Sequence, residues 1–552
     1  MSLVCKKSSI ILFVLLAIFI KMFFYCHGNI STDTGREVMI PYEILSGKIL
    51  YKDILNIYGP LAYYINALFY KLLGIKTESL YIGGAISSLI YLFVLNKICR
   101  YFFSQKLSLL ITLFVALSCV YNSRLFNFIL PYSYSMTYGL TFYTCAIYFI
   151  LKGIKSGNLM FLSLASLFAG GAFACKIEFF CAILLTLFVT VAFLKADWKT
   201  IVKQTGYFLI FPICSYMVPI VQGIKFSEIL YALNIFVKSS KVPSVVEFAK
   251  QTGTAFQISD ISVWISSLVL LSIFTGFSII FLKKSKNKLQ IVLCLMIVSL
   301  IHYISLPDTH FSWLACAIFL FIIFQIKHLR EKPEYLVLIL GAAGASLRTI
   351  FNVNTNEYGA YSFPLLFVAF LAILYLYREN ILKKLNINTE KLLVFVLLAG
   401  IISNFVYSIM QIKMYSTPII TERGRIDTTF SWANGAKNII KFLKENTSEK
   451  DKVLFLPEGC LLNFLSLRNT DMNIYALNQP YIETYGEDKI IEMIEKANIN
   501  IIVIIDGFGL YNFNNERYYF KQNQITDYIK LNYEIICTDK NDSYEVLILS
   551  KK

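Results

Sequence analysis

The sequence predicts a polytopic α-helical membrane protein with about thirteen transmembrane helices and a small α/β domain at its C-terminal end. Three observations predict this fold class. The 552 residues are 57% hydrophobic and 16% aromatic. Apolar runs of about 17 to 22 residues, long enough to cross a bilayer core, recur along the chain. After the last run, short β-rich segments alternate with helical ones, which is typical of a small α/β domain.

The apolar runs give thirteen candidate spans. The first contains the stretch IILFVLLAIFI and lacks a small-residue cleavage site, so we expect a retained span and not a removed signal peptide. The candidate spans cover residues 8–26, 80–96, 107–121, 135–151, 159–175, 177–194, 206–222, 262–282, 290–306, 311–326, 335–351, 361–377 and 392–411.

The distribution of Lys and Arg predicts the orientation of these spans. If the N-terminus is cytoplasmic, the inner segments and the N-terminus together carry 21 Lys or Arg and 5 Asp or Glu. The outer segments before the C-terminal region carry nearly equal numbers of each sign. This asymmetry follows the positive-inside rule. It predicts an integral protein of the plasma (inner) membrane, with the loop 27–79 and the C-terminal region outside the cytoplasm.

The excess of Lys and Arg in the inner segments also explains the net charge of +16. No basic patch with interleaved aromatic residues stands out, so nucleic acid is not an expected partner.

Twelve cysteines are scattered, mostly in or beside apolar spans, and no CxxC pair is present. Cys460 and Cys537 lie in the polar C-terminal part, and the sequence leaves open whether they pair.

We expect two domains, a transmembrane domain over residues 1–411 and an extracytoplasmic α/β domain over residues 412–552. The β-rich runs of the second domain are KVLFLP, INIIVIID, YEIIC and YEVLIL, and EDKIIEMIEKAN has a helical pattern. No Gly-rich phosphate loop follows any of these runs, and no internal repeat is evident.

The first outer loop, residues 27–79, contains unusual polar chemistry. Directly after the first span, the stretch STDTGREVMIPYEIL places Asp33, Arg36 and Glu37 at the expected membrane surface. GREVMIPYEILSG and GPLAYYINALFYKLLG are amphipathic or aromatic-rich, and both are typical of helices lying in the interface. An acid beside a span is also a common helix cap, so position alone leaves the role of Asp33 open. Asp53 and Glu37 are further candidate acids.

Cations mark the outer ends of three spans, at Arg124, Lys176 and Arg348. Lys176 lies in the tight turn ACKIEFF beside Glu178, where an unpaired charge at the membrane boundary is costly. Two interpretations are open: Lys176 pairs with Glu178 and extends to the interface, or these cations bind an anionic group such as phosphate.

The isolated histidines His302 and His310 have no metal-binding spacing, so a metal site is not indicated. Candidate substrate contacts on this face are Tyr58, Glu178, His310 and Tyr358.

The stretch DTGREVMIPYEILSGKILYKDILNIYGPLAYYINALFYKLLG resembles the first outer loop of GT-C-fold membrane glycosyltransferases. It is most similar to those grouped with family 39 and with the rhizobial galacturonosyltransferase-like domain, which share an Asp, Gly-Arg-Glu, a Pro, a G..LY.D pattern and YGPL. Shorter stretches are similar in the same order: NFILPYSYSMTYGL, GGAFACKIEFF, RTIFNVNTNEYGAYSFP and FLPEGCLLNFLSLRN. Some related transferases carry an Asp-Glu pair, whereas Thr34 follows Asp33 here.

The resemblance implies a sugar donor linked to a polyprenyl monophosphate, used on the outer face of the membrane. It also implies that Asp33 is the catalytic base and that Lys176 contacts the donor phosphate. Inverting transfer needs a carboxylate that accepts the proton of the acceptor hydroxyl and positive charge at the leaving phosphate. Arg36, Arg124, Lys176 and Arg348 are the expected phosphate-binding residues, without a cofactor or a divalent metal. The expected acceptor is a glycan, lipid or protein of the cell envelope.

Other classes compete with this hypothesis. A transporter or flippase of lipid-linked or small substrates usually has ionisable groups near the membrane midplane, and the predicted spans have almost none there. A non-catalytic protein of envelope assembly would place Asp33 away from any cavity. A polymerase or ligase of lipid-linked glycans would be expected to rely on a large loop late in the chain. The sugar, the acceptor and the oligomeric state do not follow from the sequence.

Overall fold

The computed structural model describes residues 13–14, 16–20, 32–121, 125–284, 290, 294–300, 311–377, 388–507, 521, 523–540 and 544–552, without the side chains of residues 32, 33, 282–284 and 507. The candidate spans 8–26 and 290–306 therefore lie mostly outside the described residues. Arg124 and His310 lie outside them as well, and so does the side chain of Asp33.

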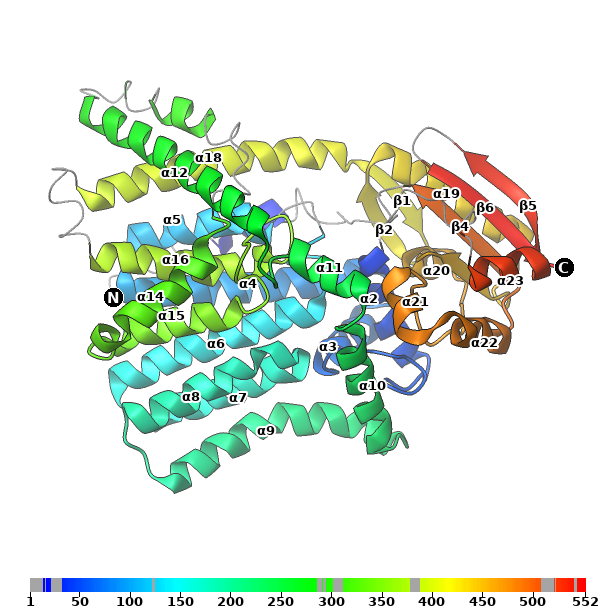
Figure 1. Ribbon diagram of the computed structural model, residues 1–552, viewed down its shortest axis with the longest axis horizontal. Coiled ribbons are helices and arrows are strands. Elements are labelled where there is room, and N and C mark those ends of the chain that lie inside the picture. Colours follow the sequence, from blue (N-terminus) through cyan, green and yellow to red (C-terminus); the bar gives the residue numbers. More distant parts are fainter. Residues whose placement is uncertain are drawn as a thin grey trace.

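A bundle of helices forms the larger part of the molecule, and its members lie side by side (Figure 1). The remaining eleven candidate spans each coincide with a helix of this bundle. These helices are α4 (Thr77–Phe102), α5 (Gln105–Val115) with the π-helical turn η2 (Ala116–Val120), α6 (Tyr134–Ser156), α7 (Leu159–Cys175), the 3₁₀ turn η3 (Ile177–Phe180) with α8 (Cys181–Ala192), α9 (Trp198–Val221), α12 (Ile258–Lys284), α14 (Leu314–Leu329), α15 (Pro333–Ala345), α16 (Gly359–Leu376) and α18 (Thr389–Met414).

Length and composition show which described helices can cross a membrane. Five are long and apolar enough: Thr77–Phe102, Trp198–Val221, Ile258–Phe281, Gly359–Leu376 and Thr389–Met414. Five shorter apolar helices accompany them: Gln105–Val120, Leu159–Cys175, Ile177–Ala192, Leu314–Leu329 and Pro333–Ala345. Helix α15 ends at Ala345, six residues before the expected end of its span, so Arg348 lies in the connection to α16 and not in a span.

The first loop forms two helices, α2 (Thr32–Leu45) and α3 (Leu61–Leu73). Helix α3 leaves Leu68 and Leu72 exposed, as expected of a helix in the membrane interface. Helix α2 is instead buried between α3 and α20 (Cys460–Ser466) of the C-terminal part. A Cβ atom at Gly35 would lie 2.5 Å from the backbone nitrogen of Leu461. The Gly of the Gly-Arg-Glu motif therefore permits this close approach.

Two further helices lie in the loop 223–261, for which the sequence predicted no structure. Helix α10 (Phe226–Ser239) and helix α11 (Pro243–Gln251) lie between the bundle and the C-terminal part (Figure 1). Both pack on α21 (Gln479–Tyr485). Ser244 donates backbone and hydroxyl hydrogen bonds of 3.0 and 2.7 Å to Glu483, which fixes α11 to the C-terminal part.

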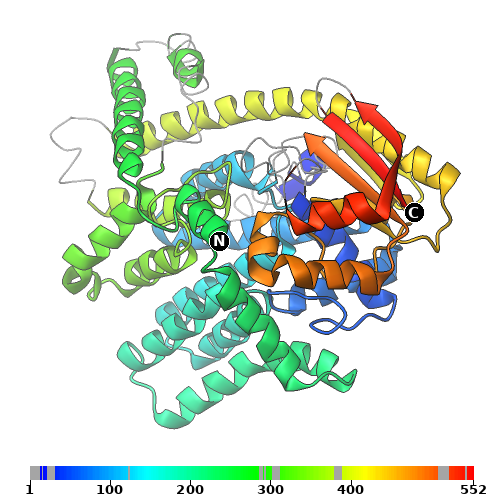
Figure 2. The same cartoon turned by 45° about the vertical axis from the view of Figure 1, so that its right-hand side comes forward.

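The C-terminal part contains the expected mixture of helices and strands. After α18, the hairpin of β1 (Thr417–Thr421) and β2 (Gly424–Thr428) leads into helix α19 (Phe430–Asn446). A four-stranded sheet follows, in the order β3 (Val453–Leu456), β4 (Ile501–Gly507), β6 (Tyr544–Lys551) and β5 (Tyr533–Lys540). Strand β3 is parallel to β4, and the other two pairings are antiparallel. Figure 2 shows α18 running from the bundle into this part.

Both faces of the sheet are covered. Side chains alternate along β4: Ile502 and Ile504 belong to a core shared with α22 (Glu487–Ala497) and α23 (Gln524–Asn532), whereas Val503 and Ile505 belong to the core shared with α19 and the bundle. Each of the β-rich runs noted in the sequence overlaps one of these strands. Cys460 and Cys537 are both free thiols, so they do not pair.

Candidate active site

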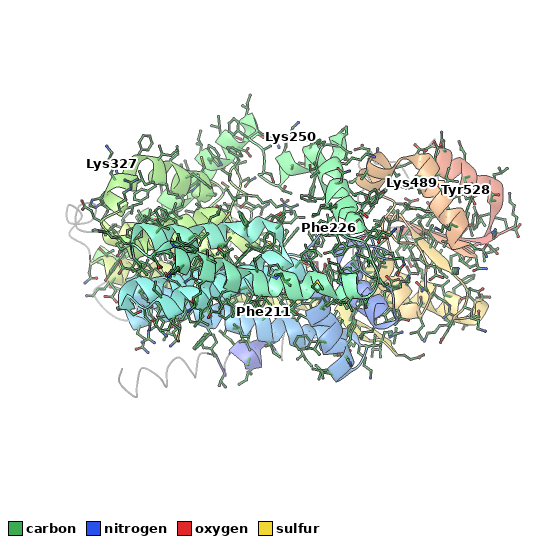
Figure 3. The ribbon with its side chains drawn as sticks, turned by 90° about the horizontal axis from the view of Figure 1, so that it is seen from below. Phe211, Phe226, Lys250, Lys327, Lys489 and Tyr528 are labelled. Carbon is green, nitrogen blue, oxygen red and sulfur yellow. The ribbon has the colours of Figure 1, made fainter. Side chains whose placement is uncertain are left out.

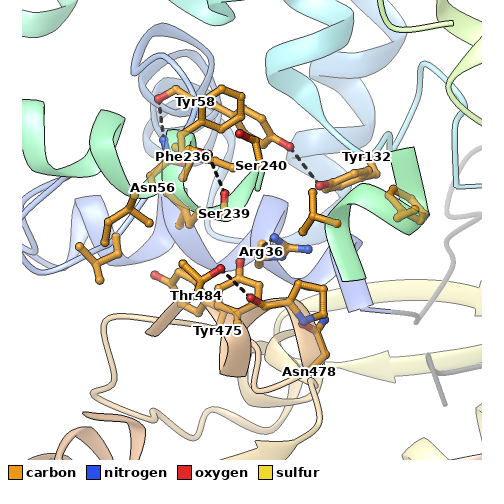
Figure 4. Close-up of a pocket in the computed structure, with 18 of the residues that line it drawn as sticks. Arg36, Asn56, Tyr58, Tyr132, Phe236, Ser239, Ser240, Tyr475, Asn478 and Thr484 are labelled. Carbon is orange, nitrogen blue, oxygen red and sulfur yellow. Dashed lines mark hydrogen bonds between the residues drawn. The ribbon is translucent and has the colours of Figure 1, made fainter. Parts of the chain in front are cut away.

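A cavity of about 250 Å³ lies where the bundle, the first loop and the C-terminal part meet. Its walls come from α2, from the segment 55–58 before α3, from α10 and α11, from the α15–α16 connection and from the segment around α21. Figure 4 shows that Arg36, Tyr58, Ser239 and Asn478 approach it from different elements. Arg36, Glu37, Tyr58, Arg348 and Tyr358 all line it. The structure therefore brings together residues that lie more than 300 positions apart.

Beside this cavity, Glu178 lies between two cations. Its Oε2 is 3.3 Å from Lys176 Nζ and its Oε1 is 3.6 Å from Arg348 Nη1. The Lys176 side chain is almost fully buried, and burial lowers its pKa. The side chains of Arg348 and Glu178 keep about a third of their surface exposed. Both interpretations of Lys176 thus retain support, because it pairs with Glu178 and also lies beside a cavity that Arg36 and Arg348 line.

At Gly59 the first loop approaches the end of α7, next to Lys176, as closely as Gly35 approaches α20. Gly59 donates a backbone hydrogen bond of 3.1 Å to the carbonyl of Cys175, and a Cβ atom at Gly59 would lie 2.1 Å from the carbonyl oxygen of Ala174. This contact places the ring of Tyr58 against Lys176, whose Nζ is 5.2 Å from the ring centroid. The Gly of the YGPL motif is therefore required for packing at the end of α7.

Tyrosine side chains lie between and beside Lys176 and Arg348 at the cavity. The hydroxyls of Tyr58 and Tyr132 are 3.0 Å apart, and the guanidinium of Arg348 lies 3.7 Å from the centroid of Tyr358. Tyr361 donates a hydrogen bond of 2.6 Å to the carbonyl of Tyr132. Burial raises the pKa of Tyr58 to about 12, so its hydroxyl stays protonated at neutral pH. These rings hold the cations and leave neutral hydroxyls at the cavity.

Arg36 joins the first loop to the C-terminal part. Its Nε donates to Glu458 Oε1 at 3.1 Å, and its Nη1 donates to the Tyr481 hydroxyl at 3.1 Å. The Glu458 side chain is fully buried, and burial raises its pKa although Arg36 acts in the opposite direction. Within the described residues, Glu458 Oε2 has no hydrogen-bond partner. Arg36 is therefore the counter-charge of a buried carboxylate as well as a cation at the cavity.

Glu37 is also buried, and it links α2 to α6. Its Oε2 accepts the backbone N–H of Tyr134, the first residue of α6, at 2.9 Å. A carboxylate at this position is favourable because the first N–H groups of a helix have no partner within the helix. Burial outweighs this interaction and raises the pKa of Glu37 to about 7. Glu37 therefore changes its charge near neutral pH.

This pKa gives a testable pH dependence of stability. Between the ordinary carboxyl pKa and about 7, the folded state binds more protons at Glu37 than the unfolded state does, so Glu37 lowers stability as the pH rises. We expect Glu37→Gln to remove this contribution, which is up to about 3 kcal/mol. The melting temperature of the variant relative to wild type should rise from pH 5 to pH 8. A difference independent of pH would contradict the assignment.

The remaining sequence candidates lie elsewhere or are not described. Asp53 accepts the backbone N–H of Ile49 at 2.8 Å, closes a turn, and does not line the cavity. The Asp33 side chain, Arg124 and His310 lie outside the described residues. Among the described residues, no group of three or more His, Cys, Asp or Glu side chains is arranged to hold a metal ion.

Several lining residues were not singled out from the sequence. Glu458 lies behind the cavity, and Tyr475, Asn478 and Tyr481 line it from the C-terminal part. Their positions depend on contacts across more than 400 residues, which no local pattern reveals. The only available signal was the FLPEG segment, which contains Glu458 and was noted for its resemblance without a role.

The fold is similar to the folds of solved membrane-protein structures. The crystal structure of ArnT from Cupriavidus metallidurans bound to undecaprenyl phosphate is similar over 98% of this chain and 98% of that chain, with a TM-score of 0.55 and 12% sequence identity. The Archaeoglobus fulgidus oligosaccharyltransferase in complex with Zn and sulfate is similar over 89% of this chain and 67% of that chain, with a TM-score of 0.50 and 13% identity. The chain has the GT-C fold. This confirms the expected fold class, and the apolar helices make the chain an integral membrane protein.

The sequence comparison adds a match over part of the bundle. Residues 58–220 match the family described as dolichyl-phosphate-mannose-protein mannosyltransferase. This segment begins at Tyr58 and includes Lys176 and Glu178. The comparison with curated proteins found no match. The finer grouping with family 39 or the rhizobial enzymes stays a prediction, because the matched segment covers a minority of the chain.

Proposed function

We propose that this chain is a membrane glycosyltransferase that moves a sugar from a polyprenyl monophosphate to an envelope glycan, lipid or protein, with inversion at the anomeric carbon. The observation that carries the proposal is the grouping of Arg36, Lys176 and Arg348 at or beside one cavity of a GT-C fold. The family match over residues 58–220 and the undecaprenyl phosphate bound to the similar ArnT structure support the same donor class.

The charges around the cavity suit a phosphate group. Arg36, Lys176 and Arg348 are cations, while Glu178 and Glu458 are the carboxylates paired with them, and Glu37 is partly protonated near pH 7. The group therefore has an excess positive charge, which an anionic ligand would neutralise. As the sugar–phosphate bond breaks, these cations stabilise the charge that develops on the leaving polyprenyl phosphate.

Asp33 is the proposed general base. Helical spacing places positions 33, 36, 37 and 40 on one face of α2, and Arg36, Glu37 and Ile40 all line the cavity. In the proposed reaction, the acceptor oxygen attacks the anomeric carbon, its proton passes to the Asp33 carboxylate, and the bond to the phosphate oxygen breaks. Lys327 lies at the end of the bundle away from the C-terminal part (Figure 3), which suits the expected orientation with the cavity at the outer face.

Binding of the donor phosphate tests the proposal. Each charged contact removed should weaken binding of undecaprenyl phosphate by about 10- to 100-fold, so we expect this loss for Lys176→Met and for Arg348→Met in nanodiscs. Methionine keeps most of the Lys176 side-chain volume. The matched control is Lys250→Met on α11, where the ion pair with Glu247 is exposed. Equal affinity of wild type and both site variants would contradict the proposed phosphate site.

A further inference from the structure

The cavity has two chemically different walls. Its charged lining residues, Arg36, Glu37 and Arg348, come from α2 and from the α15–α16 connection. A second part of the lining comes from α10, α11 and the segment around α21, and it adjoins Arg36, which donates a hydrogen bond to Tyr481. This second part consists of uncharged residues: Ile235, Phe236, Ser239, Ser240, Val245, Phe248, Tyr475, Asn478, Pro480, Tyr481, Thr484 and Tyr485. We call these twelve residues the neutral wall.

Four of the six hydroxyl groups of the neutral wall donate their protons within the protein. Ser239 donates to the carbonyl of Phe236 at 2.9 Å, and Thr484 donates to the carbonyl of Pro480 at 2.6 Å. Ser240 and Tyr475 likewise donate to protein oxygens. Because a hydroxyl has one proton and two lone pairs, these groups retain acceptor capacity toward a ligand. Figure 4 shows Ser239, Ser240, Tyr475 and Thr484 around the cavity.

The side chain of Asn478 adds a further hydrogen-bond acceptor to the neutral wall. Its Oδ1 is buried and has no hydrogen-bond partner among the described residues. The residue stands at the start of α21 and its side chain does not cap that helix. A buried acceptor left without a partner is unfavourable, and a ligand that donates a hydrogen bond removes this cost. The side chain therefore favours a ligand with hydroxyl groups over one with a carboxylate or phosphate at this wall.

We propose that the neutral wall binds the acceptor of the transfer as an uncharged, hydroxyl-rich saccharide. This inference rests on the proposed function, in which the cationic side holds the donor phosphate. The rings of Tyr481 and Tyr485 are stacked with centroids 6.2 Å apart and provide apolar surface for the faces of sugar rings. Recognition of an extended peptide by strand addition needs a free strand edge, and none of the twelve residues lies in a strand. The wall therefore suits a saccharide better than a peptide.

Equilibrium binding to the full-length protein in nanodiscs tests this assignment. The probes are a panel of neutral oligosaccharides of common hexoses, N-acetylhexosamines, deoxyhexoses and pentoses, a panel of uronic-acid and phosphorylated oligosaccharides, and Ser/Thr-containing peptides. We expect a neutral oligosaccharide to bind, and Asn478→Ala to raise its Kd roughly 3- to 10-fold. Asn478→Asp retains an acceptor oxygen and should retain binding. The matched control is Asn446→Ala, at the exposed end of α19.

Undecaprenyl phosphate, measured on the same proteins, separates this inference from the proposed function. We expect Asn478→Ala to leave its affinity unchanged and Arg348→Met to weaken it. If undecaprenyl phosphate binds but no neutral oligosaccharide does, or if only charged oligosaccharides or peptides bind, the neutral wall is misassigned. Neutral oligosaccharide binding that does not depend on Asn478 would overturn it as well. If undecaprenyl phosphate fails to bind the wild type, the proposed function itself fails.

Discussion

Replacing Asp33 with asparagine is expected to lower the rate of sugar transfer by about 10²- to 10⁴-fold, the usual contribution of a general base. Asparagine is nearly the same size as aspartate but cannot accept the proton of the acceptor hydroxyl. Binding of the polyprenyl phosphate donor should remain, because the proposed phosphate contacts come from Arg36, Lys176 and Arg348. The measurement is single-turnover transfer from labelled polyprenyl-phosphate sugars by the purified protein.

Asp53 provides the comparison for this prediction, because it is the rival acid in the same loop. Its carboxylate accepts the N–H of Ile49 and does not line the cavity. An asparagine side-chain oxygen can accept the same hydrogen bond, so Asp53→Asn should keep most of the transfer activity. Full activity of Asp33→Asn, together with loss of activity in Asp53→Asn, would move the base to Asp53.

Replacing Arg36 with methionine is expected to have the largest effect on stability. The variant leaves the buried Glu458 without its cation, and removing one partner of a buried ion pair costs about 3 to 5 kcal/mol. Burial already raises the pKa of Glu458, and loss of Arg36 raises it further, so the variant should be less unstable at low pH than at neutral pH. Thermal unfolding at pH 5 and pH 8 measures both effects.

A second substitution separates the structural role of Arg36 from its role at the cavity. Arg36→Met combined with Glu458→Leu removes both charges and should recover most of the lost stability. Transfer activity should stay low, because the cation at the cavity is still missing. As a control, Lys441→Met disrupts the exposed pair with Glu445 and should cost less than about 1 kcal/mol. Recovery of activity in the double variant would restrict Arg36 to a structural role.

The bundle and the first loop were largely predictable from the sequence. Apolar length and charge asymmetry are local signals, and eleven candidate spans coincide with helices. The β-rich runs around Val453 and Ile501 likewise became strands of the sheet. Helices α10 and α11 were missed, because their stabilising contacts are with α21, more than 200 residues later in the chain.

The site was predictable only in part, because local sequence signals mark some of its residues and distant contacts bring in the others. Lys176 and Arg348 stand out because each lies at the expected outer end of a span in a loop with few other cations, and the structure places both beside Glu178. Glu458 and Asn478 are single polar residues without a recognisable catalytic motif, and only folding brings them to α2 and the cavity. The burial of α2 against α20 was likewise not evident, because an amphipathic segment after a span has the same pattern as a helix in the membrane interface.

The fate of the label in a proteoliposome assay distinguishes sugar transfer from transport of the lipid-linked sugar. Purified protein is mixed with a panel of polyprenyl-phosphate sugars labelled in the sugar and with an envelope extract as acceptor. For one of these donors, we expect label to leave the lipid, free polyprenyl monophosphate to appear in equal amount, and the new glycosidic bond to have the inverted configuration. Label that crosses the bilayer while still attached to the lipid would instead show a transporter and exclude the proposed transfer.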